Sequence, residues 1–245
     1  MMIYGVEAVY LGVTEESVND ALGTPLEIGS SWVREKDCTW EANILFLPPS
    51  TTGLDMYYQW DNTNYTSYAS YLESVAAPNV VIDSIDLEPA CDAIGVTWVQ
   101  TTQAGGFDYK MDLVPPSQLQ ATVAADGTAC RVVTAVTFDD ASGNAVVISY
   151  GWQGDTTTLY EAQTVIATPS NVASATTTLA DEGYFISAFC GNDAVGYILV
   201  GMRVKGDSLP RPITVSTSVP TSMPYYVPVV YLAESGAGTS VIYER

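Results

Sequence analysis

Residues 132–155 read VVTAVTFDDASGNAVVISYGWQGD, and this pattern recurs along the chain. Two runs rich in β-branched residues, which favour strands, flank Asp139–Asn144, whose Asp, Ser, Gly and Asn residues are typical of a tight turn. Residues 185–207, FISAFCGNDAVGYILVGMRVKGD, have the same order of apolar run, polar turn and apolar run, and their closing Gly206-Asp207 follows Gly154-Asp155 by 52 residues. The sequence therefore predicts two copies of one β-hairpin.

Counterparts of the second strand of this hairpin stand upstream at similar intervals, at Ile94–Trp98 and at Ala42–Leu47. A helix candidate precedes each of the first three hairpins, and its apolar residues are four apart, the spacing that places two side chains on one helix face. The apolar pairs of these three candidates are Val18 with Leu22, Tyr71 with Val75, and Leu119 with Val123. Aligned by this pattern, Gly127 and Gly183 stand at the ends of the third and fourth helices.

The third and fourth helix candidates differ in how clearly they are marked. Ser117–Gln120 follows two prolines and has the form of a capping box, which predicts a helix start there. The fourth candidate contains Thr176–Thr178, whose β-branched side chains lose rotamer freedom in a helix. The helical pattern is therefore weakest in the fourth copy.

A strand candidate, in most copies rich in aromatic residues, precedes each helix position. These strands are predicted at Tyr4–Leu11, Met56–Trp60, Phe107–Leu113, Leu159–Ile166 and Ile213–Ser216. Dividing the chain before them gives units of about 1–53, 54–106, 107–158, 159–210 and 211–245. The fifth unit has only Pro220–Pro224 where its helix would stand, followed by predicted strands at Tyr225–Leu232 and Ser240–Tyr243.

The sequence thus predicts a β-rich α+β fold of about five β-α-β-β units in a single repeat domain, 1–245. Such units bury their apolar faces only against one another, and closing them into a pseudo-fivefold ring, like an α/β-propeller, removes exposed strand edges. The alternative is an all-β or α+β protein without true repeats, divided into two domains near Pro115-Pro116.

The layout of five β/α units about a pseudo-axis resembles the pentein superfamily. The resemblance implies a fold layout alone, because no motif of that superfamily is found and its guanidine-modifying enzymes use a catalytic histidine that this chain does not contain. No activity is implied for any residue.

Composition sets further limits on the class of protein. The chain of 245 residues is 47% hydrophobic and carries a net charge of −20, which predicts a folded, soluble protein that does not bind nucleic acid, because such binding needs clustered Lys and Arg. No apolar run is long enough to span a bilayer, and residues 1–7 lack the features of a signal peptide. The compartment stays open, with the composition favouring a cell-surface, extracellular or virion protein.

The absence of histidine is the sharpest chemical statement that the sequence makes. It excludes Ser-His-Asp and Cys-His catalysis and zinc sites that use imidazole within this chain. Paired carboxylates remain as an enzymatic option, and the visible pairs are Asp139-Asp140, Asp83 with Asp86, and Glu15-Glu16. The first pair has the sequence of a turn and the last stands at a predicted helix start, so both have structural explanations.

No metal site or cofactor is expected. The four cysteines, Cys38, Cys91, Cys130 and Cys190, have no C-x-x-C spacing and are expected to be free, buried thiols. Calcium bound by oxygen ligands of the turns stays an alternative, although no D-x-D-x-D-G loop is present.

Aromatic and amide side chains gather at 56–71. Such residues stack on and hydrogen-bond to sugars and also dominate protein interfaces. The predicted binding residues are Tyr57, Tyr58, Trp60, Asn62, Asn64 and Tyr65. The alternative is that these rings belong to an edge strand and a helix and pack into the core.

The function predicted from the sequence is a non-catalytic binding or structural protein, whose Tyr- and Trp-rich surface engages a protein or a glycan, or which assembles with itself. The alternative is a polysaccharide hydrolase that uses paired carboxylates.

Overall fold

The structure is a computed structural model, and it describes residues 8–14, 27–36, 39–47, 54–61, 67–88, 93–101, 106–168, 170–192, 196–211, 213–216, 227–234 and 238–244. Side chains are described for 67–87, 94–96, 98, 106–168, 170–191, 196–211 and 213. The predicted helix around Val18 and Leu22 lies outside these residues, as do Cys38 and Cys91.

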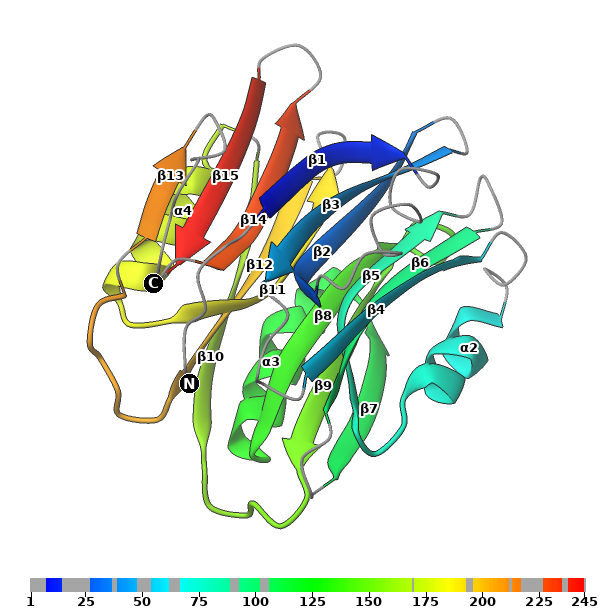
Figure 1. The fold of residues 1–245 in the computed structure, drawn as a ribbon. Helices are drawn as coiled ribbons and strands as arrows, with labels where there is room; N and C mark the ends of the chain where they lie inside the picture. Colours follow the sequence, from blue (N-terminus) through cyan, green and yellow to red (C-terminus); the bar gives the residue numbers. More distant parts are fainter. Residues whose placement is uncertain are drawn as a thin grey trace.

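The fold is β-rich, and its strands form small antiparallel sheets of three strands each (Figure 1). In every sheet the strand that comes third in the sequence lies between the other two. In spatial order the sheets are β1 (Ala8–Thr14), β3 (Thr39–Leu47), β2 (Glu27–Lys36); β4 (Leu54–Asp61), β6 (Ala93–Thr101), β5 (Val80–Glu88); β7 (Phe107–Val114), β9 (Asn144–Trp152), β8 (Arg131–Asp139); β10 (Tyr160–Ala167), β12 (Gly196–Val204), β11 (Phe185–Asn192); and β13 (Ile213–Ser216), β15 (Gly238–Glu244), β14 (Val227–Glu234).

The predicted hairpin at 132–155 is confirmed. Asp139 ends β8, and its carbonyl oxygen accepts the N–H groups of Ser142 and Gly143 at 3.1 and 2.7 Å. Gly143 takes a φ of 70°, a left-handed conformation that glycine adopts without a steric cost. The matching hairpin joins β11 to β12 between Asn192 and Gly196.

Three α-helices lie in the described part of the chain: α2 (Tyr68–Val75), α3 (Leu119–Thr128) and α4 (Val172–Asp181). The weakly marked α4 does form, and in it the hydroxyls of Thr176, Thr177 and Thr178 each donate to the carbonyl oxygen four residues earlier, at 2.8 to 2.9 Å. These bonds satisfy the hydroxyl groups within the helix itself.

Two details of the predicted helix ends are wrong. The capping box does not form: Pro116–Gln118 is a 3-10 turn, α3 begins at Leu119, and Gln118 at its N-cap makes no side-chain capping bond. Gly127 lies inside α3. Gly183 follows α4 with a φ of 88°, and the residue at the corresponding position after α3 is Cys130, with a φ of 61°. Alignment by glycine alone missed this because a cysteine holds the left-handed position.

A β-bulge recurs in the second strand of every sheet. The pairing of that strand with the central strand shifts by one residue, which leaves Gly29, Asp83, Thr134, Ser187 and Val229 unpaired with it. A bulge bends its strand and increases the local twist. The residues just before the five bulges are Ile28, Ile82, Val133, Ile186 and Pro228.

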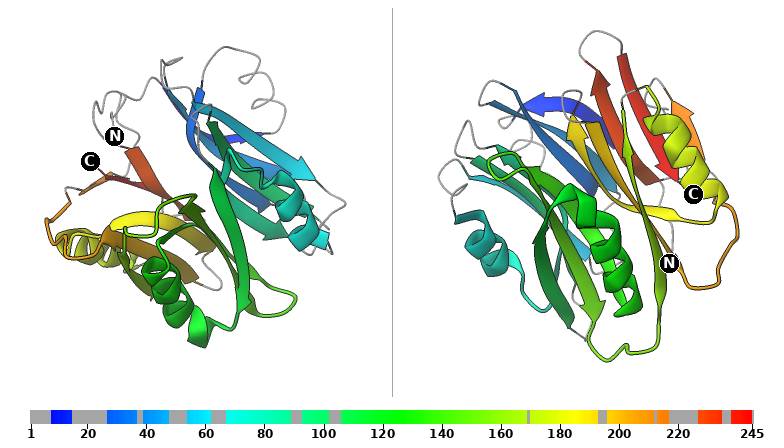
Figure 2. Two further views of the ribbon diagram at one scale, coloured as in Figure 1. Left: turned by 90° about the horizontal axis from the view of Figure 1, so that it is seen from below. Right: turned by 180° about the vertical axis from the view of Figure 1, so that it is seen from behind.

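The bulged strands also make the contacts between sheets. β2 contacts β5, β5 contacts β8, β8 contacts β11, β11 contacts β14, and β14 contacts β2. Figure 1 shows these strands toward the middle of the molecule, with α2, β7, β10 and β13 at its periphery. In the right-hand view of Figure 2, α3 lies along β10, the first strand of the sheet that follows its own.

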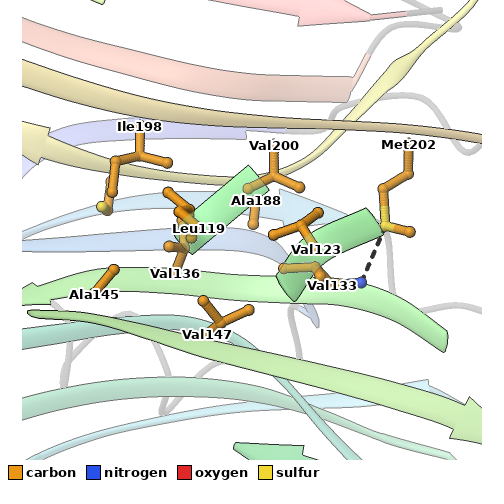
Figure 3. Packing of buried hydrophobic residues seen from close by; sticks show 11 residues of the cluster. Leu119, Val123, Val133, Val136, Ala145, Val147, Ala188, Ile198, Val200 and Met202 are labelled. Carbon is orange, nitrogen blue, oxygen red and sulfur yellow. Dashed lines mark hydrogen bonds between the residues drawn. The ribbon is translucent and has the colours of Figure 1, made fainter. Parts of the chain in front are cut away.

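The core consists of layers between consecutive sheets. Leu119 and Val123 of α3 and Val147 of β9 pack with Val200 and Met202 of β12, so one cluster joins two sheets and a helix (Figure 3). Alternate residues of β9 belong to a different cluster, shared with β5, β6 and α2. Because both faces of β9 are covered, its sequence is an almost continuous apolar run instead of an alternating one.

Among the helices that the structure describes, none is both long and apolar enough to cross a membrane.

Candidate functional site

The predicted aromatic site falls on β4 and on the residues that follow it. Tyr57, Tyr58 and Trp60 lie in this edge strand, paired with Trp98, Thr97 and Gly95 of β6. Asn62, Asn64 and Tyr65 lie outside the described residues, and the side chains of β4 are not among those described. The structure therefore gives a register position for half of the predicted site.

That register position is informative because two other sheets occupy it with described residues. Leu113 of β7 pairs with Val146, and Ile166 of β10 pairs with Ile198. Each of these partners lies on its central strand, three residues before the residue that opposes the bulge of the same sheet. Gly95, the partner of Trp60, lies the same number of residues before the residue that opposes the bulge of its own sheet. Trp60, Leu113 and Ile166 thus share one position, which we call the rim position.

The rim position is open to solvent in both sheets whose side chains are described. Leu113 is 47% exposed and Ile166 is 57% exposed, although neighbouring residues on the same face of each strand pack against a helix. Their central-strand partners are fully buried, so exposure is a property of the outer edge strand and not of the whole layer. An apolar residue is therefore presented at the same place in two sheets.

The neighbouring aromatic residues of α2 have a structural role. Tyr68, Tyr71 and Val75 are partly buried against the cluster formed by Leu72 and Ile82, among others. The hydroxyl of Tyr68 lies 3.5 Å from an Asp139 carboxylate oxygen of the next sheet. The pKa of Tyr68 is raised, mainly by burial and in addition by this carboxylate. For these rings the alternative of core packing is the better description.

A second group of aromatic side chains spans β7 and β9. The Phe107 ring meets Trp152 edge to face with centroids 5.0 Å apart, and Tyr109 lies 5.6 Å from Tyr150. Burial raises the pKa of Tyr150 to about 12, and burial likewise places the pKa of Tyr109 well above its usual value. Trp152 alone in this group is exposed, at 41%.

The candidate catalytic carboxylates have structural partners or lie apart. Asp139 accepts hydrogen bonds from the hydroxyl of Ser142 at 2.6 Å and from the N–H of Ala141 at 3.2 Å, so it stabilises its own turn. Asp140 is exposed in that turn. Asp83 is the bulge residue of β5 and Asp86 follows three residues later, whereas Glu15 and Glu16 lie outside the described residues.

Other carboxylates form partly exposed ion pairs within the third sheet and its helix α3. Asp126, nearly fully buried, lies 2.6 Å from the Lys110 amine, which is 2.5 Å from Asp112. Arg131 donates to the Asp108 carboxylate at 2.5 Å and to the Ser149 hydroxyl at 3.0 Å. Burial lowers the pKa of Lys110, but the hydrogen bonds with Asp112 and Asp126 raise it by more. The pKa of Lys110 is therefore raised overall, and this amine stays charged.

The cysteines with described side chains are free thiols. Cys190 is buried and Cys130 is half-buried, and neither forms a disulfide. Burial raises the pKa of Cys190 far above its usual value, which makes it a poor nucleophile. Within the described part of the chain, no group of three or more His, Cys, Asp or Glu residues is placed to hold a metal ion.

Comparison of the chain with known protein families, with characterised proteins and with solved structures finds no match. The interpretation of the site therefore depends on its own residues.

Proposed function

We propose that the chain is a non-catalytic binding or assembly protein, in which five small sheets close into a pseudo-fivefold ring and the rim positions contact a protein or a glycan. Three observations support the ring: the common strand order, the bulge at one place in each sheet, and the succession of contacts β2–β5–β8–β11–β14–β2. A repeat of this kind provides a stiff scaffold whose outer strands differ in sequence.

The observation that carries the binding role is the rim position. Leu113 and Ile166 are exposed apolar residues on edge strands, and Trp60 shares their register position beside Tyr57 and Tyr58. An indole on a rigid edge strand suits stacking on a sugar ring or the centre of a protein contact, because it supplies a large area with little loss of side-chain entropy. The net charge of −20 disfavours a nucleic acid as the partner.

The test uses a glycan array and light scattering after size exclusion, with the wild type and Trp60→Ala. We expect Trp60→Ala to weaken glycan or partner binding at least tenfold while the circular dichroism spectrum stays unchanged, since hot-spot aromatics contribute about 2 kcal/mol or more. The matched control is Trp152→Ala, which removes an exposed indole elsewhere on the surface. Equal binding by wild type and Trp60→Ala, with both folded, would refute the rim site.

The hydrolase alternative rests on Asp83 and Asp86, which are three residues apart in β5. Release of reducing sugar from a polysaccharide panel by the wild type, lost in Asp83→Asn and Asp86→Asn, would replace the binding proposal with the enzymatic one.

The ring has its own test in a circular permutant. Joining residue 245 to residue 1 by a flexible linker and opening the chain in the exposed turn after Gly154 keeps every sheet intact. A ring permits this rearrangement, so we expect a cooperative unfolding transition close to that of the wild type. A permutant that fails to unfold cooperatively would favour an open row of sheets.

A further inference from the structure

One backbone hydrogen bond joins consecutive sheets at the same register position. The Ile82 N–H of β5 donates to the Tyr150 hydroxyl of β9 at 3.1 Å. The Val133 N–H of β8 lies 3.1 Å from the Met202 sulfur of β12, the contact drawn in Figure 3. All four residues are buried, where an unpaired N–H is costly.

Both bonds follow one rule. The donor is the residue that precedes the bulge of one sheet. The acceptor lies on the central strand of the next sheet, where one residue pairs with the residue that precedes that next sheet's bulge. The acceptor is the residue that follows this pairing residue in the chain. Ser149 pairs with Val133 and precedes Tyr150, and Gly201 pairs with Ile186 and precedes Met202. The rule therefore assigns a donor and an acceptor to every junction.

A second hydrogen bond strengthens the junction between the second and third sheets. The Thr134 hydroxyl, at the bulge of β8, donates to the Ile82 carbonyl oxygen at 2.6 Å. Both polar groups of Ile82 are thus satisfied by the following sheet. A bulge residue without a hydroxyl cannot make this bond.

The rule distinguishes the first sheet from the others. By register the acceptor positions of the five sheets are Leu47, Val99, Tyr150, Met202 and Glu244. From the fifth sheet to the first, Pro228 has no N–H and Leu47 has no side-chain acceptor atom. From the first sheet to the second, Ile28 has an N–H, but Val99 has no side-chain acceptor atom.

The bulge positions do not repeat this distinction. Gly29 and Val229 have no side-chain donor, a carboxylate at Asp83 cannot donate, and the Ser187 hydroxyl donates to the Val200 carbonyl oxygen of its own sheet at 3.3 Å. The distinction therefore depends on the backbone donor positions, where the junction from the fourth sheet to the fifth has the Ile186 N–H, with Glu244 at the acceptor position.

We propose that the first sheet, β1–β3, is the segment of the ring that opens on its own, ahead of global unfolding, because the residues at both of its junctions cannot form the hydrogen bond seen from the second sheet to the third and from the third to the fourth. The inference rests on the proposed ring. Local opening of one cooperative segment is expected wherever its contacts with the remainder are weaker. The ring therefore has a built-in seam at its first sheet.

The experiment is hydrogen–deuterium exchange with mass spectrometry on the full chain at pH 7. We expect the amides of β1, β2 and β3 to exchange together, about tenfold or more faster than those of β8, β9, β11 and β12. The fifth sheet is the comparison, because β14 keeps its contact with β11 of the fourth sheet whether or not the ring is closed. We therefore expect β14 and β15 to stay protected.

Paired substitutions test the hydrogen bond itself. Val99→Met places an acceptor at the first junction, and Val99→Leu is its control without one. We expect exchange of β2 to be about threefold or more slower in Val99→Met than in Val99→Leu. Should the Val99 variants fail to fold, Met202→Leu and Tyr150→Phe give the converse test, because each removes an acceptor and is expected to speed exchange at Val133 and Ile82.

The outcomes separate the two proposals. Protection of β1–β3 equal to that of β8 and β9 overturns the seam and leaves the ring standing. Fast exchange of the fifth sheet together with the first also overturns the seam, because the first sheet then does not open on its own, whereas the ring is overturned by a circular permutant that fails to unfold cooperatively. Unchanged exchange at Val133 and Ile82 in Met202→Leu and Tyr150→Phe overturns the hydrogen-bond rule.

Discussion

The side-chain amide of Gln120 in α3 bonds to the backbone of β10 at Thr164 as the backbone of a neighbouring strand would. Its oxygen accepts the Thr164 N–H at 2.7 Å, and its nitrogen donates to the Ala162 carbonyl oxygen at 3.0 Å. β10 is an edge strand, whose unpaired backbone groups would otherwise be open to another chain. Gln120 thus closes part of this edge.

Gln120→Leu is expected to lower the free energy of unfolding by about 1–2 kcal/mol, because two backbone groups lose their partners. It also opens an edge, so scattering at high protein concentration should rise. Urea unfolding and static light scattering measure the two effects. Gln118→Leu, on the exposed turn before α3, is the control and should change neither. Identical behaviour of the two variants would contradict the edge-closing role.

Tyr150→Phe keeps the ring of Tyr150 and removes the acceptor for the Ile82 N–H. We expect a loss of about 1–3 kcal/mol in the free energy of unfolding, since a buried N–H is left unpaired. Tyr160→Phe is the control, because no hydrogen bond joins its hydroxyl to a described side chain or backbone group. A Tyr150→Phe protein as stable as this control would show that the junction bond contributes nothing.

Raising the pH should destabilise the protein between pH 10 and pH 12. Burial raises the folded-state pKa of Tyr150 from 10.0 to about 12, so its contribution is complete below pH 10 and is lost as the pH rises to the folded-state value. A shift of this size corresponds to roughly 3 kcal/mol. Urea midpoints measured from pH 9 to pH 12 should fall more steeply for the wild type than for Tyr150→Phe; parallel curves would contradict the assignment.

Two isoleucines paired across β10 and β12 should respond very differently to truncation. Ile198 is fully buried, and Ile198→Ala is expected to cost about 2–5 kcal/mol because it leaves a cavity. Ile166 is 57% exposed at the rim position, and Ile166→Ala should cost less than about 1 kcal/mol. Thermal and urea unfolding of the pair measure the difference. A cost of several kcal/mol for Ile166→Ala would mean that the rim position is part of the core.

Much of the strand pattern could be predicted because local chemistry marks it. The turn at Asp139–Asn144 and the Gly-Asp pairs at 154 and 206 locate the hairpins, and β-branched runs fill the strands between them. The helix ends were harder, because Cys130 holds a left-handed position usually marked by glycine, and because Gln120 bonds to another sheet instead of capping its own helix. The error at Gln120 arises where a distant contact overrides the local signal.

From the sequence, the predicted site could be recognised only by its aromatic and amide composition. Tyr68 and Trp60 belong to the same aromatic stretch, yet Tyr68 packs against the core whereas Trp60 stands at a register position that is exposed in two other sheets. Nothing within residues 56–71 separates these roles. Whether an aromatic residue is buried or exposed depends on which side of an edge strand the next helix covers. That arrangement results from the packing of one sheet against another.

The sequence alone determined the alternation of strands and helices, the exclusion of histidine chemistry and the acidic surface, because each depends on the identity or spacing of nearby residues. Only the tertiary structure decided which apolar residues meet, such as Val133 with Met202, and which backbone groups of one sheet are satisfied by the next. Those contacts join residues far apart in the chain, where spacing carries no information about approach in space.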